Sequence, residues 1–240
     1  MEFGDELRAY LTRNLAAHDR LVIPLDGRRH AAVAVVVVDS DEREHGTDHH
    51  HAATGMRLDH IPGAEDYELT GSISGTAGGP AVVLTRRNAR LRAHAGQWAL
   101  PGGRVDDGEE PLDTARRELQ EELALTLPGD ALLGCLDDYP TRSGYVITPF
   151  VFWGGADPPM HPQPDEVLSV HRISFRELTR PDSPRFVTIS ESPRPVVQLP
   201  IGGDLIHAPT GAIVLQFRRV AIDGVCERVH EYEQPVFAWG

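Results

Sequence analysis

The stretch "GGRVDDGEEPLDTARRELQEELAL" (residues 102–125) decides the fold, because it joins a glycine turn to an amphipathic helix. Pro111 suits the first turn of a helix, where its missing N–H costs no hydrogen bond. Apolar residues recur at helical spacing at Leu112, Ala115, Leu119 and Leu123. One helix face is therefore predicted to be buried. The apolar run "WALPGG" precedes the helix, so the local order is strand, glycine-rich loop, helix.

Eight of the residues in this stretch are acidic, and like charges on one helix repel one another. Glu118, Glu121 and Glu122 stand at i, i+3 and i+4, which places their Cβ atoms roughly 5–6 Å apart on one face. Carboxylates that close raise one another's pKa unless a cation lies between them. A solvated charged face is the alternative, with Arg116 and Arg117 offsetting part of the charge. The spacing favours a site for a hard divalent cation, Mg²⁺ or Mn²⁺.

The stretch resembles the Nudix box, G-x5-E-x7-R-E-U-x-E-E-x-G-U, in which U is aliphatic. The matching residues are Gly103, Glu109, Arg117, Glu118, Leu119, Glu121, Glu122 and Leu125. Ala124 stands where the box has its last glycine, and alanine tolerates a positive φ less well. The resemblance implies an α/β fold, a Nudix-type α/β/α sandwich with a mixed sheet. It also implies hydrolysis of a nucleoside diphosphate linked to another group.

The resemblance assigns a metal site to the acidic helix. Glu118, Glu121 and Glu122 are the implied ligands of Mg²⁺ or Mn²⁺, together with the carbonyl of Gly103. Glu121 and Glu122 are also implied to be catalytic. Such an ion screens the charge of a diphosphate and makes water more acidic.

Two further roles concern the groups around the metal. Arg117 is expected to orient Glu109 or a ligand carboxylate, because a bidentate arginine–carboxylate pair is rigid. The general base of Nudix enzymes is a box glutamate in some and a distant acid in others. Glu166, where a proline-rich loop meets a predicted strand, is the distant candidate, and an ordinary exposed acid is the alternative.

A basic segment lies directly upstream of the glycine turn, in "VVLTRRNARLRAHAGQWALPGG" (82–103). Its arginines are Arg86, Arg87, Arg90 and Arg92. A solvated turn is the plain interpretation of any one of them. Four together beside a metal site favour binding of a polyanionic substrate. Trp98 in the same segment is interpreted as a packing residue, with stacking on a base as the alternative.

The same segment resembles the signature of coenzyme A pyrophosphatases, L-L-T-x-R-[S/A]-x3-R-x3-G-x3-F-P-G-G. The matches are Leu84, Thr85, Arg87, Arg92, Gly96, Pro101, Gly102 and Gly103, and the departures are Val83, Asn88 and Leu100. The resemblance implies that CoA or acyl-CoA is cleaved to 3′,5′-ADP and (acyl-)4′-phosphopantetheine. Thr85, Arg86, Arg87 and Arg92 are the expected substrate-binding residues.

Two alternatives to this function stay open. The first is a Nudix hydrolase for ADP-ribose, NADH or a nucleoside triphosphate. The second is a catalytically silent domain that senses a nucleotide. Three intact, mutually repelling glutamates disfavour the silent domain.

The composition limits the partners of the chain. The 240 residues carry a formal net charge of −13, which argues against binding to nucleic acid or to anionic membranes. The apolar run "AAVAVVVV" (31–38) is too short to span a bilayer. Cys135 and Cys226, far apart in the sequence, favour reduced thiols in a cytoplasmic protein. The expected partner is a small CoA-like nucleotide, and a homodimer is left open.

Strand and helix patterns interleave along the chain, which favours an α/β sandwich. Strands are predicted at 31–39, 81–87, 132–139, 145–154, 166–174 and 195–201, and helices at 5–18, 111–123, 175–179 and 209–222. Residues 40–80 are polar and rich in glycine, and we interpret most of them as a loop insertion. The prediction is a single domain over 1–240 that carries this insertion.

Overall fold

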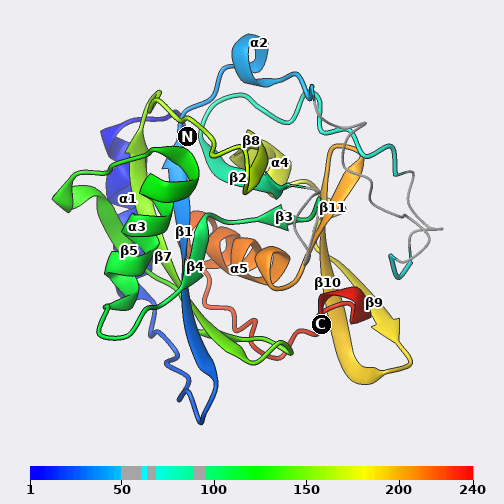
Figure 1. The fold of residues 1–240 in the computed structure, drawn as a ribbon. Helices are drawn as coiled ribbons and strands as arrows, with labels where there is room; N and C mark the ends of the chain where they lie inside the picture. The colour runs from blue at the N-terminus through cyan, green and yellow to red at the C-terminus, as the bar shows by residue number, and fades with distance from the viewer. Residues whose placement is uncertain (50–60, 64–68, 89–95, 240) are drawn as a thin grey trace.

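The computed structural model describes residues 1–49, 61–63, 69–88 and 96–239. Its main element is an eight-stranded sheet with the principal order β3-β2-β1-β7-β5, in which β4 also pairs with β1, β6 with β7 and β8 with β2 (Figure 1). The strands are β1 (Arg29–Val38), β2 (Ala81–Arg87), β3 (Trp98–Ala99), β4 (Gly102–Arg104), β5 (Leu132–Cys135), β6 (Tyr139–Pro140), β7 (Tyr145–Gly155) and β8 (Val167–Ser174). The β1–β7 pair is parallel and the other pairs of this sheet are antiparallel. The predicted mixed sheet is confirmed.

Helices cover both faces of this sheet, as predicted for an α/β/α sandwich. On one face lie α1 (Asp5–Ala17), α5 (Thr210–Phe217) and its π-helical continuation η5 (Arg218–Ile222), and on the other lies α3 (Pro111–Leu123). Alternate residues of β1 contribute to the two cores, Val35 on the α1 and α5 side and Val36 on the α3 side. A strand buried on both faces needs a nearly continuous apolar sequence, which is what β1 has.

A second, three-stranded sheet was only partly predicted. It has the order β11-β10-β9, and Figure 1 shows it beside α5. Its strands are β9 (Arg185–Ile189), β10 (Ser192–Ile201) and β11 (Asp204–His207), and α4 (Phe175–Leu178) also contacts β10. The short helical turns η4 (Gly129–Ala131) and η6 (Val236–Ala238) complete the elements of the described residues. The predicted strand at 195–201 lies within β10, whereas β9 and β11 were not predicted.

The segment 40–80 contains the short helix α2 (Glu42–His45) and, in its described part, no strand. It does not lie only on the surface, however. Asp48, Ile73 and Ala77 are buried, and the Ile73 amide donates to the Asp48 carboxylate at 3.2 Å. Our interpretation of this segment as a loop is therefore incomplete, because part of it packs into the core. The single domain over 1–240 and the insertion itself stay predictions.

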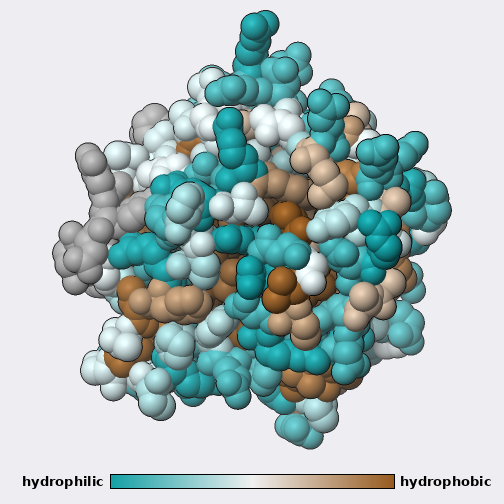
Figure 2. Space-filling model, turned by 180° about the vertical axis from the view of Figure 1, so that it is seen from behind, coloured by the Kyte–Doolittle hydropathy of each residue, from teal (hydrophilic) through white to brown (hydrophobic). Residues whose placement is uncertain are grey.

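On the face opposite to that of Figure 1, hydrophilic side chains predominate and apolar ones gather in smaller groups between them (Figure 2). Within the described ranges, no helix has both the length and the apolar character needed to cross a bilayer.

Helix α3 ends at the one position where the sequence departs from the Nudix box. Ala124 takes a left-handed conformation, with φ 53° and ψ 27°, and the Leu125 amide donates back to the Leu119 carbonyl at 3.1 Å. A glycine commonly ends helices in this way, because other residues pay about 1–2 kcal/mol for the left-handed conformation.

Ala124→Gly should therefore stabilise the protein by about 1 kcal/mol or less, because the greater freedom of glycine in the unfolded chain offsets part of the gain. Ala124 is exposed, so the methyl group contributes little packing. Urea unfolding measures the change. The control Ala9→Gly, inside α1, should instead destabilise by roughly 0.5–1 kcal/mol. A loss of stability in Ala124→Gly would contradict the expected strain.

Candidate active site

The glutamates of α3 lie against β4, the strand that carries the glycine turn. Gly103 pairs with Ala32 of β1, and a Cβ atom placed on Gly103 would lie 2.1 Å from Oε1 of Glu118. The Glu118 carboxylate therefore packs directly on the Gly103 backbone, and only a glycine leaves room for it. Glu122 is buried and the Glu118 side chain is 12% exposed, whereas the Glu121 side chain is 56% exposed. Two of the three predicted ligands point to the sheet and the third lies at the rim.

Burial makes both inner carboxylates hard to ionise. It raises the pKa of Glu122 to about 8, with the Glu118 charge adding to the effect and the Arg87 charge opposing it. Burial also raises the pKa of Glu118, against the hydrogen bond from Arg117. Two buried acids that resist ionisation together are suited to binding a cation.

Arg117 joins the acids of this site. Its Nε and Nη2 donate to the two oxygens of Glu109 at 3.0 and 3.2 Å, and its Nη1 donates to Glu118 at 2.9 Å and to Glu121 at 3.1 Å. The hydrogen bond from Arg117 lowers the pKa of Glu109 to about 2. These contacts support the predicted orienting role of Arg117, which stays a prediction.

The chemistry of the donors fits a hard divalent cation, since Glu122 is a buried and Glu118 a partly buried carboxylate, both with raised pKa values. In the part of the chain that the structure describes, however, no three His, Cys, Asp or Glu side chains lie close enough to hold a metal ion. Glu121 turns toward Arg117 instead. It would have to leave this contact to join the other two, and the ligand set including the Gly103 carbonyl stays a prediction.

Glu166, the distant candidate for the general base, lies near the two inner glutamates. It is exposed, and its charge raises the pKa of both Glu118 and Glu122. Its loop is held to the end of α3, where the Gln163 amide donates to the Glu122 carbonyl at 2.8 Å. The position supports the candidate, and the catalytic role stays a prediction.

The predicted substrate-binding role is wrong for Thr85 and Arg86, because both side chains lie inside the protein. Thr85 is buried and donates to the Ala99 carbonyl at 3.3 Å. Arg86 is fully buried in ion pairs with Asp48 and Asp204. Arg87 comes directly after Arg86 on the strand, where successive side chains point to opposite faces. The β2–β8 register also shifts between these two arginines, so they lie in different surroundings.

A cleft of about 350 Å³ opens beside β4. Its apolar lining includes Val33, Trp98, Leu100, Ile147, Leu205, Ile213 and Phe237. Arg87 lines it, and its Nε lacks a hydrogen-bond partner among the described residues; its substrate-binding role stays a prediction. His207 also lines the cleft, and burial lowers its pKa to about 4, so the imidazole is neutral near pH 7. Arg90 and Arg92 lie outside the described residues.

Arg104 is a cleft residue that we did not predict. It is exposed and lines the cleft next to Gly103. The alternation along β4 directs Arg104 to the face opposite Glu118. Its position immediately after the two glycines is a sequence signal for a residue close to the cleft, whereas our prediction rested on the arginines upstream of the turn.

Metal-free protein should lose thermal stability as the pH rises from about 6.5 to about 8, because below about 6.5 the lowered pKa of His207 acts in the opposite direction. The pKa of Glu122 rises from 4.5 to about 8 on folding, so the folded state binds this proton more tightly and loses that advantage across the window. Thermal unfolding in a chelator measures the profile. The effect of Glu109, whose pKa is lowered to about 2, lies below this window. Glu122→Gln should flatten the profile, and a flat wild-type profile would contradict the raised pKa.

The sheet, the acidic helix and the cleft form an α/β fold, and comparison with known proteins relates it to a family. Residues 73–190 match the model of the NUDIX domain. These residues of the chain therefore form a Nudix domain. The match excludes β1 and α5, which the structure shows to be integral to the fold.

Two curated relatives are each described as an uncharacterized Nudix hydrolase NudL. The protein of Pectobacterium atrosepticum is 40% identical over 99 residues, which are 41% of this chain and 52% of the relative. That of Citrobacter koseri is 41% identical over 105 residues, which are 42% of this chain and 53% of the relative. The chain thus spans about half the length of these relatives. A solved MutT/nudix family protein from Enterococcus faecalis matches this chain with a TM-score of 0.51 at 16% sequence identity. The match covers 92% of this chain and 76% of the chain of that protein, and it supports the fold.

Proposed function

We propose that the protein is a metal-dependent pyrophosphohydrolase that cleaves CoA or acyl-CoA to 3′,5′-ADP and (acyl-)4′-phosphopantetheine. One observation carries the reaction type. The Glu118 carboxylate packs against Gly103 at the edge of a cleft that Arg87 also lines, and the buried Glu122 stands one turn further along the same helix. Acidic groups that attract a cation and a basic group that attracts phosphate thus lie next to one another.

Different side chains would bind the metal ion, contact the phosphates and accept the proton. Glu118 and Glu122 would hold Mg²⁺ or Mn²⁺, with Glu121 as the third ligand. When bound, such an ion screens the charge of the diphosphate and makes water more acidic. Arg87 and Arg104 would contact phosphate oxygens, because Arg117 is already engaged by Glu109 and Glu118. Glu166 would accept the proton of the attacking water.

The choice of CoA rests on the arginine-bearing signature and on the shape of the cleft. A mainly apolar lining next to the phosphate-binding residues suits the pantetheine arm of CoA. The 3′-phosphate distinguishes CoA from ADP-ribose and NADH. Arg92 of the signature is our candidate for contacting this phosphate.

Wild-type protein should cleave CoA in preference to 3′-dephospho-CoA, ADP-ribose, NADH and nucleoside triphosphates. Product-resolved chromatography with Mg²⁺ and with Mn²⁺ tests this. Arg92→Ala should lower kcat/KM for CoA by about one to two decades, the worth of a charge-assisted hydrogen bond, and should change 3′-dephospho-CoA little.

Equal losses on both substrates would assign Arg92 to the diphosphate or to the turn. Cleavage of ADP-ribose but not of CoA would exclude the CoA assignment and retain the reaction type. Binding of CoA without cleavage of any substrate would favour the nucleotide-sensing alternative.

A further inference from the structure

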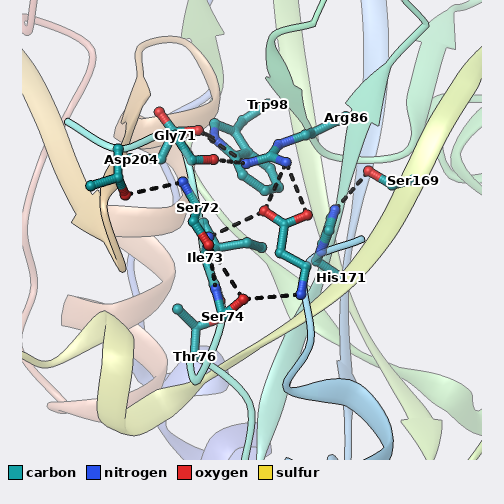
Figure 3. Close-up of polar contacts among 12 residues, drawn as sticks. Gly71, Ser72, Ile73, Ser74, Thr76, Arg86, Trp98, Ser169, His171 and Asp204 are labelled. Carbon is teal, nitrogen blue, oxygen red and sulfur yellow. Dashed lines mark hydrogen bonds and ion pairs between the residues drawn. The ribbon is translucent and has the colours of Figure 1, made fainter. Parts of the chain in front are cut away.

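The buried guanidinium of Arg86 is the centre of a polar cluster beside the cleft (Figure 3). Its Nη1 donates to Asp48 at 3.0 Å, and its Nη2 donates to Asp204 at 3.2 Å and to the Gly71 carbonyl at 2.8 Å. Its Cζ lies 4.3 Å from the ring centroid of Trp98. The Trp98 indole N–H in turn donates to Asp204 at 3.0 Å.

This cluster joins three parts of the chain to one wall of the cleft. Asp48 and Gly71 belong to the segment 40–80, Asp204 begins β11, and Arg86 lies in β2. Trp98 lines the cleft, and its backbone carbonyl accepts a hydrogen bond from Thr210 at 3.1 Å. The Trp98 ring is therefore held on one face by a cation and at its N–H by an acid, and the Trp98 backbone is held by the start of α5.

Stability alone is a poor explanation for this arrangement. Apolar residues of similar volume often replace buried ion pairs with no loss of stability. The Arg86 Nε is buried and has no hydrogen-bond partner among the described residues, so the cluster is not fully satisfied. What arginine supplies is geometry, because its planar fork holds two acids while its face stacks on an aromatic ring.

We propose that Arg86 is a positioning residue for the substrate cleft, and that Asp48 couples the segment 40–80 to the cleft through its contact with Arg86. Together they fix Trp98, the wall against which the part of the substrate beyond the diphosphate packs. This role deepens the proposed function and rests on it for the identity of the substrate. Arg86 turns away from α3, so the cluster should control substrate affinity more than the chemical step.

The test uses the full chain with Trp153→Phe and Trp239→Phe, which leaves Trp98 as its only tryptophan. In this background Arg86→Met should raise KM for CoA by roughly tenfold and change kcat by less than about threefold. The emission of Trp98 should shift and its quenching by acrylamide should increase. Arg86→Lys should recover part of both effects, because it keeps the charge but not the fork.

Asp48→Asn tests whether the segment 40–80 acts through Arg86. Alone it should move KM and Trp98 emission in the same direction as Arg86→Met. In the Arg86→Met background it should add nothing, because the interaction is already lost. Full additivity of the two substitutions would overturn the proposed coupling. If Arg86→Met fails to fold, Asp48→Asn decides alone, since Asp204 still pairs with Arg86 there.

A matched control is Arg172→Met, which removes a buried arginine of β8 that contacts Asp157 and the Asp39 carbonyl. It should destabilise the fold without changing KM or Trp98 emission. The proposal is wrong if this control raises KM as much as Arg86→Met does. It is also wrong if Arg86→Met and Asp48→Asn leave Trp98 emission unchanged. The emission does not depend on turnover, so it tests the positioning even if the wild type cleaves none of the substrates and the proposed function fails.

Discussion

Glu122→Gln should lower kcat by about two to four orders of magnitude and leave the protein folded. The amide keeps the size of the side chain but cannot carry its charge, so the proposed metal site loses on the order of 3–5 kcal/mol of transition-state stabilisation. Glu118→Gln and Glu121→Gln should act in the same direction. Because burial disfavours the ionised Glu122, the neutral amide should also raise the melting temperature of metal-free protein near pH 8. Steady-state kinetics and thermal unfolding measure the two effects.

Asp113→Asn is the matched control for this substitution. Asp113 is an exposed acid in the first turn of the same helix, away from the Glu118 and Glu122 pair. It should leave kcat unchanged. Near-wild-type turnover of Glu122→Gln at saturating Mg²⁺ would remove Glu122 from the set of ligands.

Gly103→Ala should lower kcat by about a hundredfold, which is the effect expected when a catalytic group is displaced by about 1 Å. The added methyl would lie 2.1 Å from Oε1 and 2.5 Å from Cδ of Glu118, so the carboxylate must move. The same kinetic assay tests this, with circular dichroism to confirm that the fold is retained. Gly129→Ala is the control, because a Cβ atom at Gly129 meets nothing within 4 Å. Unchanged activity of Gly103→Ala would show that the position of Glu118 is not critical.

The parts of the fold that could be predicted are those whose cause is local in the sequence. The proline start and apolar spacing of α3 are local signals, and the helix spans Pro111–Leu123 as predicted. The β-branched run of β1 and the predicted limits of β2 are of the same kind. The spacing predicted that Glu118, Glu121 and Glu122 share one face of the helix, but not that Glu118 and Glu122 turn inward while Glu121 stays exposed.

The parts that could not be predicted depend on partners far away in the sequence. Arg86 and Arg87 look alike in the sequence, and only Asp48 and Asp204, 38 and 118 positions away, distinguish the buried arginine from the cleft arginine. Arg117 and Glu121 stand at i and i+4, which allows their contact, but helical spacing does not decide that Glu121 turns to Arg117 rather than toward Glu118 and Glu122. The strands β9 and β11 are short, and their pairing with β10 gives little sequence signal.

The parallel pairing of β1 with β7 has a consequence for synthesis of the chain on the ribosome. One edge of β1 can pair with β2 and β4 early, but its other edge has no partner until residue 155 has been made. At about 5–20 residues per second this wait lasts on the order of ten seconds. During that time a nearly uncharged, β-branched strand presents an open edge to other chains. The yield of folded protein should therefore depend on chaperones that shield this strand during translation, more than on the stability of the finished sheet.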